Sequence, residues 1–222
     1  MQEHVLVVLP HPDDEAFGVA GLIALHRKAG VPVTYACGTL GEMGRNMGDP
    51  LFANRETLPL IRKRELKDAC REMDITDLRM LGLRDKTLEF EDIDNFANII
   101  EEMIKEIHPT LIVTFYPGHG VHPDHDATGA AVIHAVKRMP VEKRPPVYCM
   151  AITRNREQIL GEADVIIDIR EAAEQKLRAL KAHRSQTEGL LKQLEEKYKA
   201  KDPEVMHWFE EERFWTYQWQ NS

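Results

Sequence analysis

Two short segments of this sequence place imidazole and carboxylate side chains at close spacing. The first motif, residues 10–15, reads PHPDDE, and the second motif, residues 118–126, reads GHGVHPDHD. A catalytic zinc ion typically takes three protein ligands from His, Asp or Glu and leaves one position for water. His11 and Asp14 are three residues apart, so one helical turn would bring them to the same side. An imidazole of the second motif would then complete the ligand set.

A second carboxylate in the first motif suits the work of a general base. Asp13 would point in a different direction from Asp14 and would lie beside the metal rather than on it, where a hydrolytic base is needed. The competing interpretation is a helix start, because acidic residues after Pro12 cap free N–H groups and interact favourably with the helix dipole. A single histidine of the second motif could likewise be an ordinary surface residue. We favour the metal site because two such clusters in one chain would otherwise be two coincidences.

The elements that must position both motifs are short β-branched runs that alternate with longer helical patterns. Strands are expected at Val5–Leu9, Pro32–Gly38, Leu78–Leu81, Thr110–Tyr116, Val147–Ile152 and Val165–Ile169. Helices are expected at Gly18–Ala29, Arg55–Met73, Ile93–Ile107, Ala127–Arg138 and Glu171–Tyr198, with a loop over the site at Gly41–Asn54. This alternation predicts the α/β class, with a Rossmann-like, mostly parallel sheet flanked by helices on both faces. Each motif follows a strand, and ligands in such sheets bind beyond the carboxyl ends of the strands.

Composition limits what else the chain could be. Its 222 residues suit one large domain, 1–222, and 43% hydrophobic with 30% charged residues allow a sizeable core under a solvated surface. The net charge is -8 with acids and bases interleaved, so neither nucleic acid nor a membrane is an expected partner. Three separated cysteines and the lack of a signal-peptide pattern predict a cytoplasmic location. The GxGxxG turn of a dinucleotide-binding oxidoreductase is missing after the first strand.

Together the two motifs resemble those of the LmbE/PIG-L family of zinc-dependent N-deacetylases. Four further segments resemble the family as well, namely Thr39–Gly44, Arg62–Glu65, Leu81–Asp85 and Ala182–Gln186. Within the family, the chain is most similar to the second type of bacillithiol-biosynthesis deacetylase, which acts on N-acetylglucosaminyl malate. The resemblance implies an LmbE-like fold and a hydrolase that cleaves the N-acetyl amide of this small-molecule substrate with a metal-activated water.

The resemblance also implies a role for each polar residue of the motifs. Asp13 would be the general base, and His122 would stabilise the negatively charged oxygen of the tetrahedral intermediate. Asp124 would orient His122 by accepting a hydrogen bond from it. Zinc is the implied metal, although iron(II), manganese or cobalt could occupy the same ligands. Three residues would bind it: His11, Asp14 and His125.

One position departs from the family pattern. Some relatives carry a tyrosine two residues before the counterpart of His122, where it helps to stabilise the oxyanion, and this chain has Gly120 there. Tyr116 lies too far along the chain to replace that tyrosine automatically. Oxyanion stabilisation is therefore expected from His122 and the zinc ion.

Substrate contacts are expected from the segments after the second and third strands. Glu42, Arg62 and Asp85 match family positions near the sugar. The malate group would bring two carboxylates, so a bidentate arginine is expected nearby, and the candidates are Arg45, Arg55 and Arg62. A solvated or salt-bridged surface role is the alternative for each arginine.

Other interpretations keep the fold and change the function. A zinc amidase acting on bacillithiol S-conjugates would use the same chemistry, as would a deacetylase of chitooligosaccharides with a longer, more aromatic cleft. A non-catalytic sugar-binding protein is disfavoured because Asp13 would have no role in it. His183 and Gln186 could line the site or pack behind it. Six C-terminal aromatic residues could dock onto the domain or form the interface of a homo-oligomer: Trp208, Phe209, Phe214, Trp215, Tyr217 and Trp219.

Overall fold

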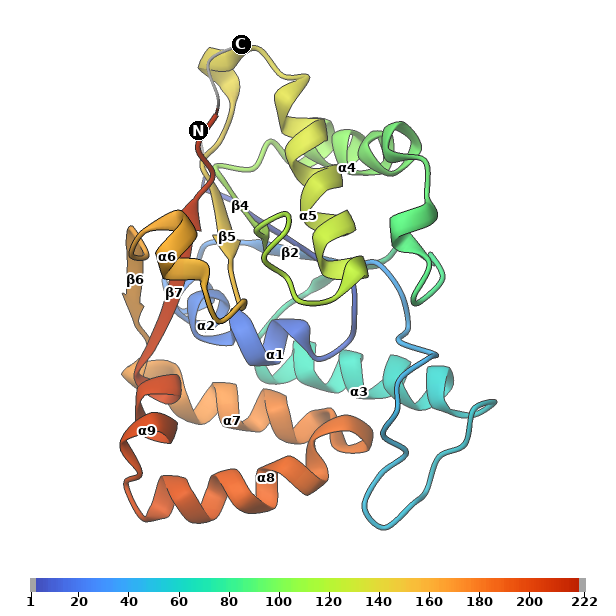
Figure 1. The fold of residues 1–222 in the computed structure, drawn as a ribbon, viewed down its shortest axis with the longest axis vertical. Helices are drawn as coiled ribbons and strands as arrows, with labels where there is room; N and C mark the ends of the chain where they lie inside the picture. The colour runs from blue at the N-terminus through green and yellow to red at the C-terminus, as the bar shows by residue number, and fades with distance from the viewer. Residues whose placement is uncertain (1–2, 220–222) are drawn as a thin grey trace.

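The computed structural model of this protein describes residues 3–219, so the expected domain bounds at 1 and 222 lie outside the described residues. Within them a seven-stranded sheet runs through the centre in the order β3-β2-β1-β4-β5-β7-β6 (Figure 1). Its strands are β1 (Val5–Leu9), β2 (Val33–Cys37), β3 (Asp77–Met80), β4 (Leu111–Phe115), β5 (Val147–Met150), β6 (Val165–Asp168) and β7 (Glu211–Thr216). All six expected strands are present, with ends that differ from expectation by at most two residues.

The parallel part of the sheet explains where a site can form. β1 pairs in parallel with β2 on one side and with β4 on the other, and β3 and β5 extend the sheet in the same direction. The chain therefore winds outward from β1 to β3 and then crosses back to β4, so the strand order reverses between β1 and β4. A crevice beyond the carboxyl ends of the strands at such a switch point is the usual ligand site of open α/β sheets.

Helices cover both faces of the sheet, and β1, β2 and β4 are buried along their whole length. The helices are α1 (Asp14–Gly18), α2 (Ala20–Lys28), α3 (Leu58–Glu72), α4 (Ile93–Ile107), α5 (Pro123–Lys137), α6 (Arg156–Leu160), α7 (Ala173–Ala182), α8 (Arg184–Lys199) and α9 (Pro203–Glu210), with short 3-10 turns at Leu88–Phe90, Val141–Lys143 and Arg170–Ala172. α4 and α5 form one core with residues such as Ile100 and Val132, and α2, α3, α7, α8 and α9 form the other with Leu66 and Leu180 (Figure 1). The predicted fold class is confirmed. Between residues 3 and 219, no helix has the length and apolar character needed to cross a membrane.

Three predicted helices begin or break at points close to the two motifs. The helix expected at Gly18–Ala29 is preceded by α1, with Val19 between α1 and α2. The helix of the second motif begins at Pro123 rather than Ala127, because proline is well suited to the first helical turn. The long C-terminal helix is broken at His183 into α7 and α8. Each of these helix ends places residues of the motifs, or residues that contact them, near the carboxyl ends of the central strands.

The C-terminal aromatic stretch forms a strand that we did not predict. β7 lies between β5 and β6 and is antiparallel to both, so the otherwise parallel sheet becomes mixed. Phe214 is fully buried, and Trp215 and Phe209 are nearly so. These aromatic residues therefore dock onto the rest of the chain, which was one of the two alternatives expected for them.

Candidate metal centre

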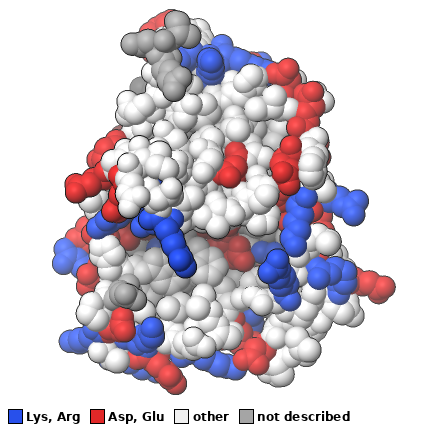
Figure 2. All heavy atoms as spheres, viewed as in Figure 1, with Lys and Arg blue, Asp and Glu red and all other residues white. Residues whose placement is uncertain are grey.

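Both motifs lie at the carboxyl ends of β1 and β4, at the switch point of the sheet. The first motif forms the turn from β1 into α1, and the second forms the turn from β4 into α5. Figure 2 shows a hollow in the middle of the face viewed in Figure 1, over α1, with acidic atoms at its floor and Lys or Arg side chains on both sides. The two clusters predicted to carry chemistry are thus neighbours in the fold.

The three expected metal ligands converge at one point. His11 Nδ1 lies 3.2 Å from His125 Nε2 and 3.5 Å from Asp14 Oδ2, and His125 Nε2 lies 3.2 Å from Asp14 Oδ1. Ligands bound tetrahedrally to zinc at about 2.0–2.1 Å are about 3.3 Å from one another, so these three separations match a zinc site. Two imidazoles and one carboxylate also suit iron(II) or another transition metal. The residues present therefore fit the expected class of metal.

Hydrogen bonds on the far side of each ring leave the facing nitrogen free to bind a metal. His125 Nδ1 lies 2.8 Å from the main-chain oxygen of Gly120, to which it donates, so in the neutral ring Nε2 carries the lone pair. His11 Nε2 lies 3.1 Å from Asp124 Oδ2 and 3.2 Å from Asp85 Oδ1, so in the same way Nδ1 carries the lone pair. Such partners fix the orientation of a histidine ring and raise the basicity of its metal-binding nitrogen.

The charge around His11 favours a cation. Burial lowers the pKa of its ring, but hydrogen bonds to Asp124, Asp14 and Asp85 raise that pKa well above the usual value. Burial raises the pKa of Asp14, but the positive charge of His125 and hydrogen bonds from both histidines hold it far below its usual range. The negative surroundings that attract a proton to these rings would also attract a divalent metal ion.

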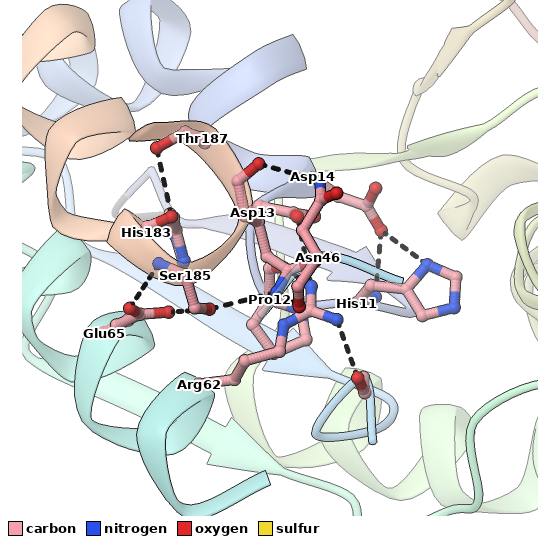
Figure 3. A network of polar contacts seen from close by, with 12 residues as sticks. His11, Pro12, Asp13, Asp14, Asn46, Arg62, Glu65, His183, Ser185 and Thr187 are labelled. Carbon is pink, nitrogen blue, oxygen red and sulfur yellow. Dashed lines mark hydrogen bonds and ion pairs between the residues drawn. The ribbon is translucent and has the colours of Figure 1, made fainter. Parts of the chain in front are cut away.

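Asp13 stands beside the three converging residues. Its φ angle of 108° lies in a region that non-glycine residues rarely adopt, at a typical cost of about 1–3 kcal/mol. Asp13 Oδ2 lies 3.0 Å from Arg62 Nη2, whereas the carboxylate of Asp14 faces His11 (Figure 3). Burial raises the pKa of Asp13 to about 6, although the charge of Arg62 lowers it. A carboxyl group with this pKa is mostly ionised near pH 7 and can accept a proton.

Arg62, expected near the sugar or the malate, is instead buried against the first motif. Nη1 donates to the main-chain oxygen of Gly41 at 2.8 Å, and Nη2 donates to the main-chain oxygen of Pro12 and to Asp13 Oδ2 (Figure 3). The residue is only 4% exposed, so its guanidinium has no open side for the bidentate malate contact that we considered. The physical reason for this correction is that Arg62 neutralises Asp13 and satisfies two buried main-chain oxygens.

Two buried acids tie the first motif and α3 to the break between α7 and α8. Glu15 has no exposed surface and accepts hydrogen bonds from His183 Nε2 and, at 3.0 Å, from the Tyr35 hydroxyl. Glu65 accepts from the main-chain N–H and the hydroxyl of Ser185, both at 2.6 Å (Figure 3). His183 therefore packs behind the site. We did not single out Glu15 from the sequence, where its only signal is that it is the third acid of the first motif.

The second motif differs from the prediction in how Asp124 holds His122. The main-chain N–H of Asp124 donates to His122 Nδ1 at 3.1 Å, so in the neutral ring Nε2 carries the hydrogen. The Asp124 carboxylate instead accepts from His11 and from the main-chain N–H groups of Lys86 and Leu88, at 2.7 and 3.1 Å. These three donors occupy the carboxylate expected to bind His122. Burial and the charges of the neighbouring histidines lower the pKa of His122, which favours a neutral ring.

His122 nevertheless reaches the centre from the second motif. One of its ring nitrogens lies within 4.8 Å of ring nitrogens of His11 and His125. Gly120 leaves no room for the larger side chain of some relatives, because a Cβ there would lie 2.4 Å from the Cβ of His125. His122 therefore lies beside the converging ligands with the Nε2–H of its neutral ring as a hydrogen-bond donor.

The loops after β2 and β3 hold each other together. The Asp85 N–H donates to Glu42 Oε1 at 2.9 Å, and a main-chain N–H of the first loop donates back to Asp85 Oδ2 at 2.7 Å. Arg55 Nη1 donates to the main-chain oxygens of Glu42 and Gly44, at 2.8 and 2.9 Å. Of the expected substrate contacts, all of which are described, only Arg45 is exposed and makes no hydrogen bond or ion pair of its side chain. Glu42, Arg55 and Asp85 help to shape the loops, and Arg62 is bound to the first motif.

Comparison with known proteins agrees with the arrangement of the two motifs. Residues 6–136, which include both motifs, match the family model described as PIG-L, GlcNAc-PI de-N-acetylase. A protein of Bacillus subtilis (strain 168), described as a probable N-acetyl-alpha-D-glucosaminyl L-malate deacetylase 2, is 70% identical over 219 residues. The match covers 99% of this chain and 99% of that protein.

Solved structures share this architecture at low sequence identity. N,N'-diacetylchitobiose deacetylase from Pyrococcus horikoshii aligns with a TM-score of 0.72 at 22% identity, over 97% of this chain and 84% of its own. GalB, the 4-carboxy-2-hydroxymuconate hydratase from Pseudomonas putida, aligns with a TM-score of 0.71 at 17% identity, over 99% of this chain and 98% of its own. Because a deacetylase and a hydratase share the fold, the fold alone does not decide the reaction.

Proposed function

Because the chain belongs to the PIG-L family, whose model is described as GlcNAc-PI de-N-acetylase, we propose that it hydrolyses the N-acetyl group of N-acetyl-α-D-glucosaminyl L-malate. The observation that carries the proposal is the convergence of His11, Asp14 and His125, next to Asp13, whose carboxylate is held by Arg62 and interacts with the charge of Asp14. The relative that is 70% identical along nearly its whole length, and is named for this reaction, supports the choice of substrate. The step would belong to bacillithiol biosynthesis.

In this mechanism the chain supplies the metal ligands, a base and a hydrogen-bond donor. When bound, the ion, zinc in our proposal, polarises the acetyl carbonyl and lowers the pKa of a water molecule. Asp13 takes the proton of the attacking water, and Arg62 holds its carboxylate in place. His122 donates its Nε2–H to the carbonyl oxygen as that oxygen gains negative charge. The leaving amine takes the proton that Asp13 accepted from the water, and acetate is released, while the neutral His122 acts as a hydrogen-bond donor. The ligands are His11, Asp14 and His125.

The loops after β2 and β3 border this centre, which supports a role for them at the sugar end of the substrate. Asp85 Oδ1 lies 3.2 Å from His11 Nε2, so this side of the cleft begins within one hydrogen bond of the metal ligands. Four of its residues are proposed sugar contacts: Glu42, Arg45, Arg55 and Asp85. We also propose one domain over residues 1–222 and a cytoplasmic location. The continuous sheet and the three free, buried cysteines support these assignments.

The test is amine release from N-acetyl-α-D-glucosaminyl L-malate and from plain N-acetylglucosamine. Metal-stripped protein and protein reloaded with zinc or iron(II) are assayed beside the protein as purified. We expect the malate conjugate to be preferred, activity to disappear on stripping and to return on reloading. Equal or absent activity on both sugars with metal bound would reject the malate substrate. Activity that survives complete metal removal would reject the metal-dependent mechanism.

A further inference from the structure

A cavity of about 540 Å³ opens from the metal centre towards the C-terminal part of the fold. Asp14 and His125 line it at the centre, and the end of β5, α6, α9 and β7 contribute to its other walls. Volumes of about 300–1,000 Å³ are usual for small-molecule sites. The cavity is therefore large enough to receive the part of a substrate that lies beyond the reacting acetyl group.

Most charged side chains that line this cavity neutralise one another. Lys176 Nζ donates to Glu212 Oε1 at 2.9 Å, and these side chains are 1% and 2% exposed. Arg213 and His207 both pair with Glu211, the histidine at 3.2 Å. The remaining acid of the lining belongs to the metal centre. These groups therefore have little capacity left for a charged ligand.

Arg156, at the start of α6, is the exception. Among the described residues its guanidinium has no carboxylate partner, and its Nη1 donates to the main-chain oxygen of Thr153 at 3.2 Å. Its central carbon lies 6.0 Å from the ring centroid of Trp215, which is itself fixed by a 2.9 Å hydrogen bond from Nε1 to the main-chain oxygen of Gly161. An arginine held over an aromatic ring with donors to spare is ready to bind a carboxylate through two parallel hydrogen bonds.

We propose that Arg156 binds the dicarboxylate half of the substrate and so selects an acidic glycoside over a neutral one. The inference rests on the proposed function, because it takes the acetyl group to lie at the metal centre. Arg156 lines the same cavity as Asp14 and His125, so a substrate with its acetyl group at the centre can extend its other half towards Arg156. Arg156 thus makes the bidentate contact that was expected of Arg62, because Arg62 is buried and cannot reach a ligand.

Two glycosides that differ only in the charge of the aglycone test the assignment. We compare kcat/KM for N-acetyl-α-D-glucosaminyl L-malate and for methyl N-acetyl-α-D-glucosaminide in zinc-loaded protein. Arg156→Met should lower the ratio of the two values by about 10- to 100-fold, mainly through KM for the malate conjugate. Arg156→Lys should restore part of the ratio. The matched control is Arg154→Met, since Arg154 is an exposed arginine two residues away that does not line the cavity, and it should leave the ratio unchanged.

Binding of the product gives a second measurement that needs no turnover. Calorimetric titration with glucosaminyl malate should show a Kd at least about tenfold higher for Arg156→Met than for wild type, with no such difference for glucosamine. If wild type prefers the malate conjugate and Arg156→Met keeps both that preference and the Kd, the inference is overturned while the proposed function stands. An equal loss on both glycosides would also overturn it. If wild type deacetylates neither glycoside, the proposed function fails, and the calorimetry alone decides whether Arg156 binds the dicarboxylate.

Discussion

Arginine side chains on the two sides of the metal centre are used in opposite ways. On one side lies the motif wall, formed by residues 39–46, 62–65 and 81–87, where Arg62 is buried and bonded to the first motif. On the other lies the chamber wall, formed by residues 150–156 and 207–215, where Arg156 has one hydrogen bond to a main-chain oxygen and no carboxylate partner among the described residues. One wall holds the reacting groups in place, and the other is free to contact a ligand.

The family comparison divides the chain along the same line. The matched family model ends at residue 136, so it includes the motif wall and stops before the chamber wall. Bonds from the motif wall reach Asp13 and His11, whereas Asp14 and His125 line the same cavity as the chamber wall. We infer that the chemistry and the choice of aglycone reside in separate parts of this fold.

The largest expected effect comes from Asp13, the proposed general base, which is held by the motif wall. Asp13→Asn removes the proton acceptor with little change in shape, so kcat should fall about 10³-fold on both the malate conjugate and the methyl glycoside. Metal content measured by atomic absorption should stay that of wild type, because Asp13 is not one of the converging ligands. If Asp13→Asn keeps more than a tenth of the wild-type kcat, Asp13 is not the general base.

The next effect concerns the stability of the chamber wall. Lys176→Met leaves Glu212 as an unpaired buried charge, so the free energy of unfolding should fall by about 3 kcal/mol in urea denaturation. The matched control is Lys192→Met, because the Lys192–Asp49 pair is exposed and its loss should cost less than about 1 kcal/mol. Equal losses in the two variants would show that the buried pair has no special importance for this wall.

A smaller effect compares the two arginines directly. Arg62→Lys keeps the charge but cannot make all the contacts of a guanidinium fork, so kcat/KM should fall about 10- to 100-fold. The loss should be the same for the malate conjugate and the methyl glycoside, in contrast to the selective loss expected from Arg156→Met. If Arg62→Lys changes the ratio of kcat/KM for the two glycosides, the two walls do not differ in the way we infer.

The smallest effect is expected at the exposed end of the motif wall. Arg45 is a proposed sugar contact, but its side chain is exposed, so water competes with the contact and Arg45→Met should lower kcat/KM by less than about threefold, equally on both glycosides. The same steady-state assay decides the matter. A tenfold loss of kcat/KM confined to the malate conjugate would show that the dicarboxylate binds at the motif wall rather than at the chamber wall.

Much of the fold was predictable because its strongest signals are local. β1 and β4 read VLVVL and LIVTF, the continuous apolar runs of strands covered on both faces. β7 was missed because EERFWT combines charges with aromatic residues and follows α9 without an intervening turn. Its place in the sheet depends on pairing with β5 and β6, which no local pattern reveals.

The candidate site divides in the same way. The spacing within the first motif predicted that His11 and Asp14 share a side, and the resemblance to the family implied that His125 completes the set. The two motifs could be expected to meet because each follows a strand of one parallel sheet. The positive φ of Asp13 and the turn of the Asp124 carboxylate towards His11 were not predictable, since both depend on contacts from distant loops. The cavity was not predictable either, because its lining comes from segments that are far apart in the sequence, such as residues 150–156 and 207–215.

The late position of β7 in the chain bears on the order in which the protein acquires its properties during synthesis. All three converging ligands are made by residue 125, whereas the chamber wall is complete only after residues 207–215 have left the ribosome. Nascent chains begin to fold from the N-terminus, so the five parallel strands can pair while β6 still lacks β7, its single partner in the described sheet. A growing chain would assemble its metal ligands before it could distinguish one glycoside from another.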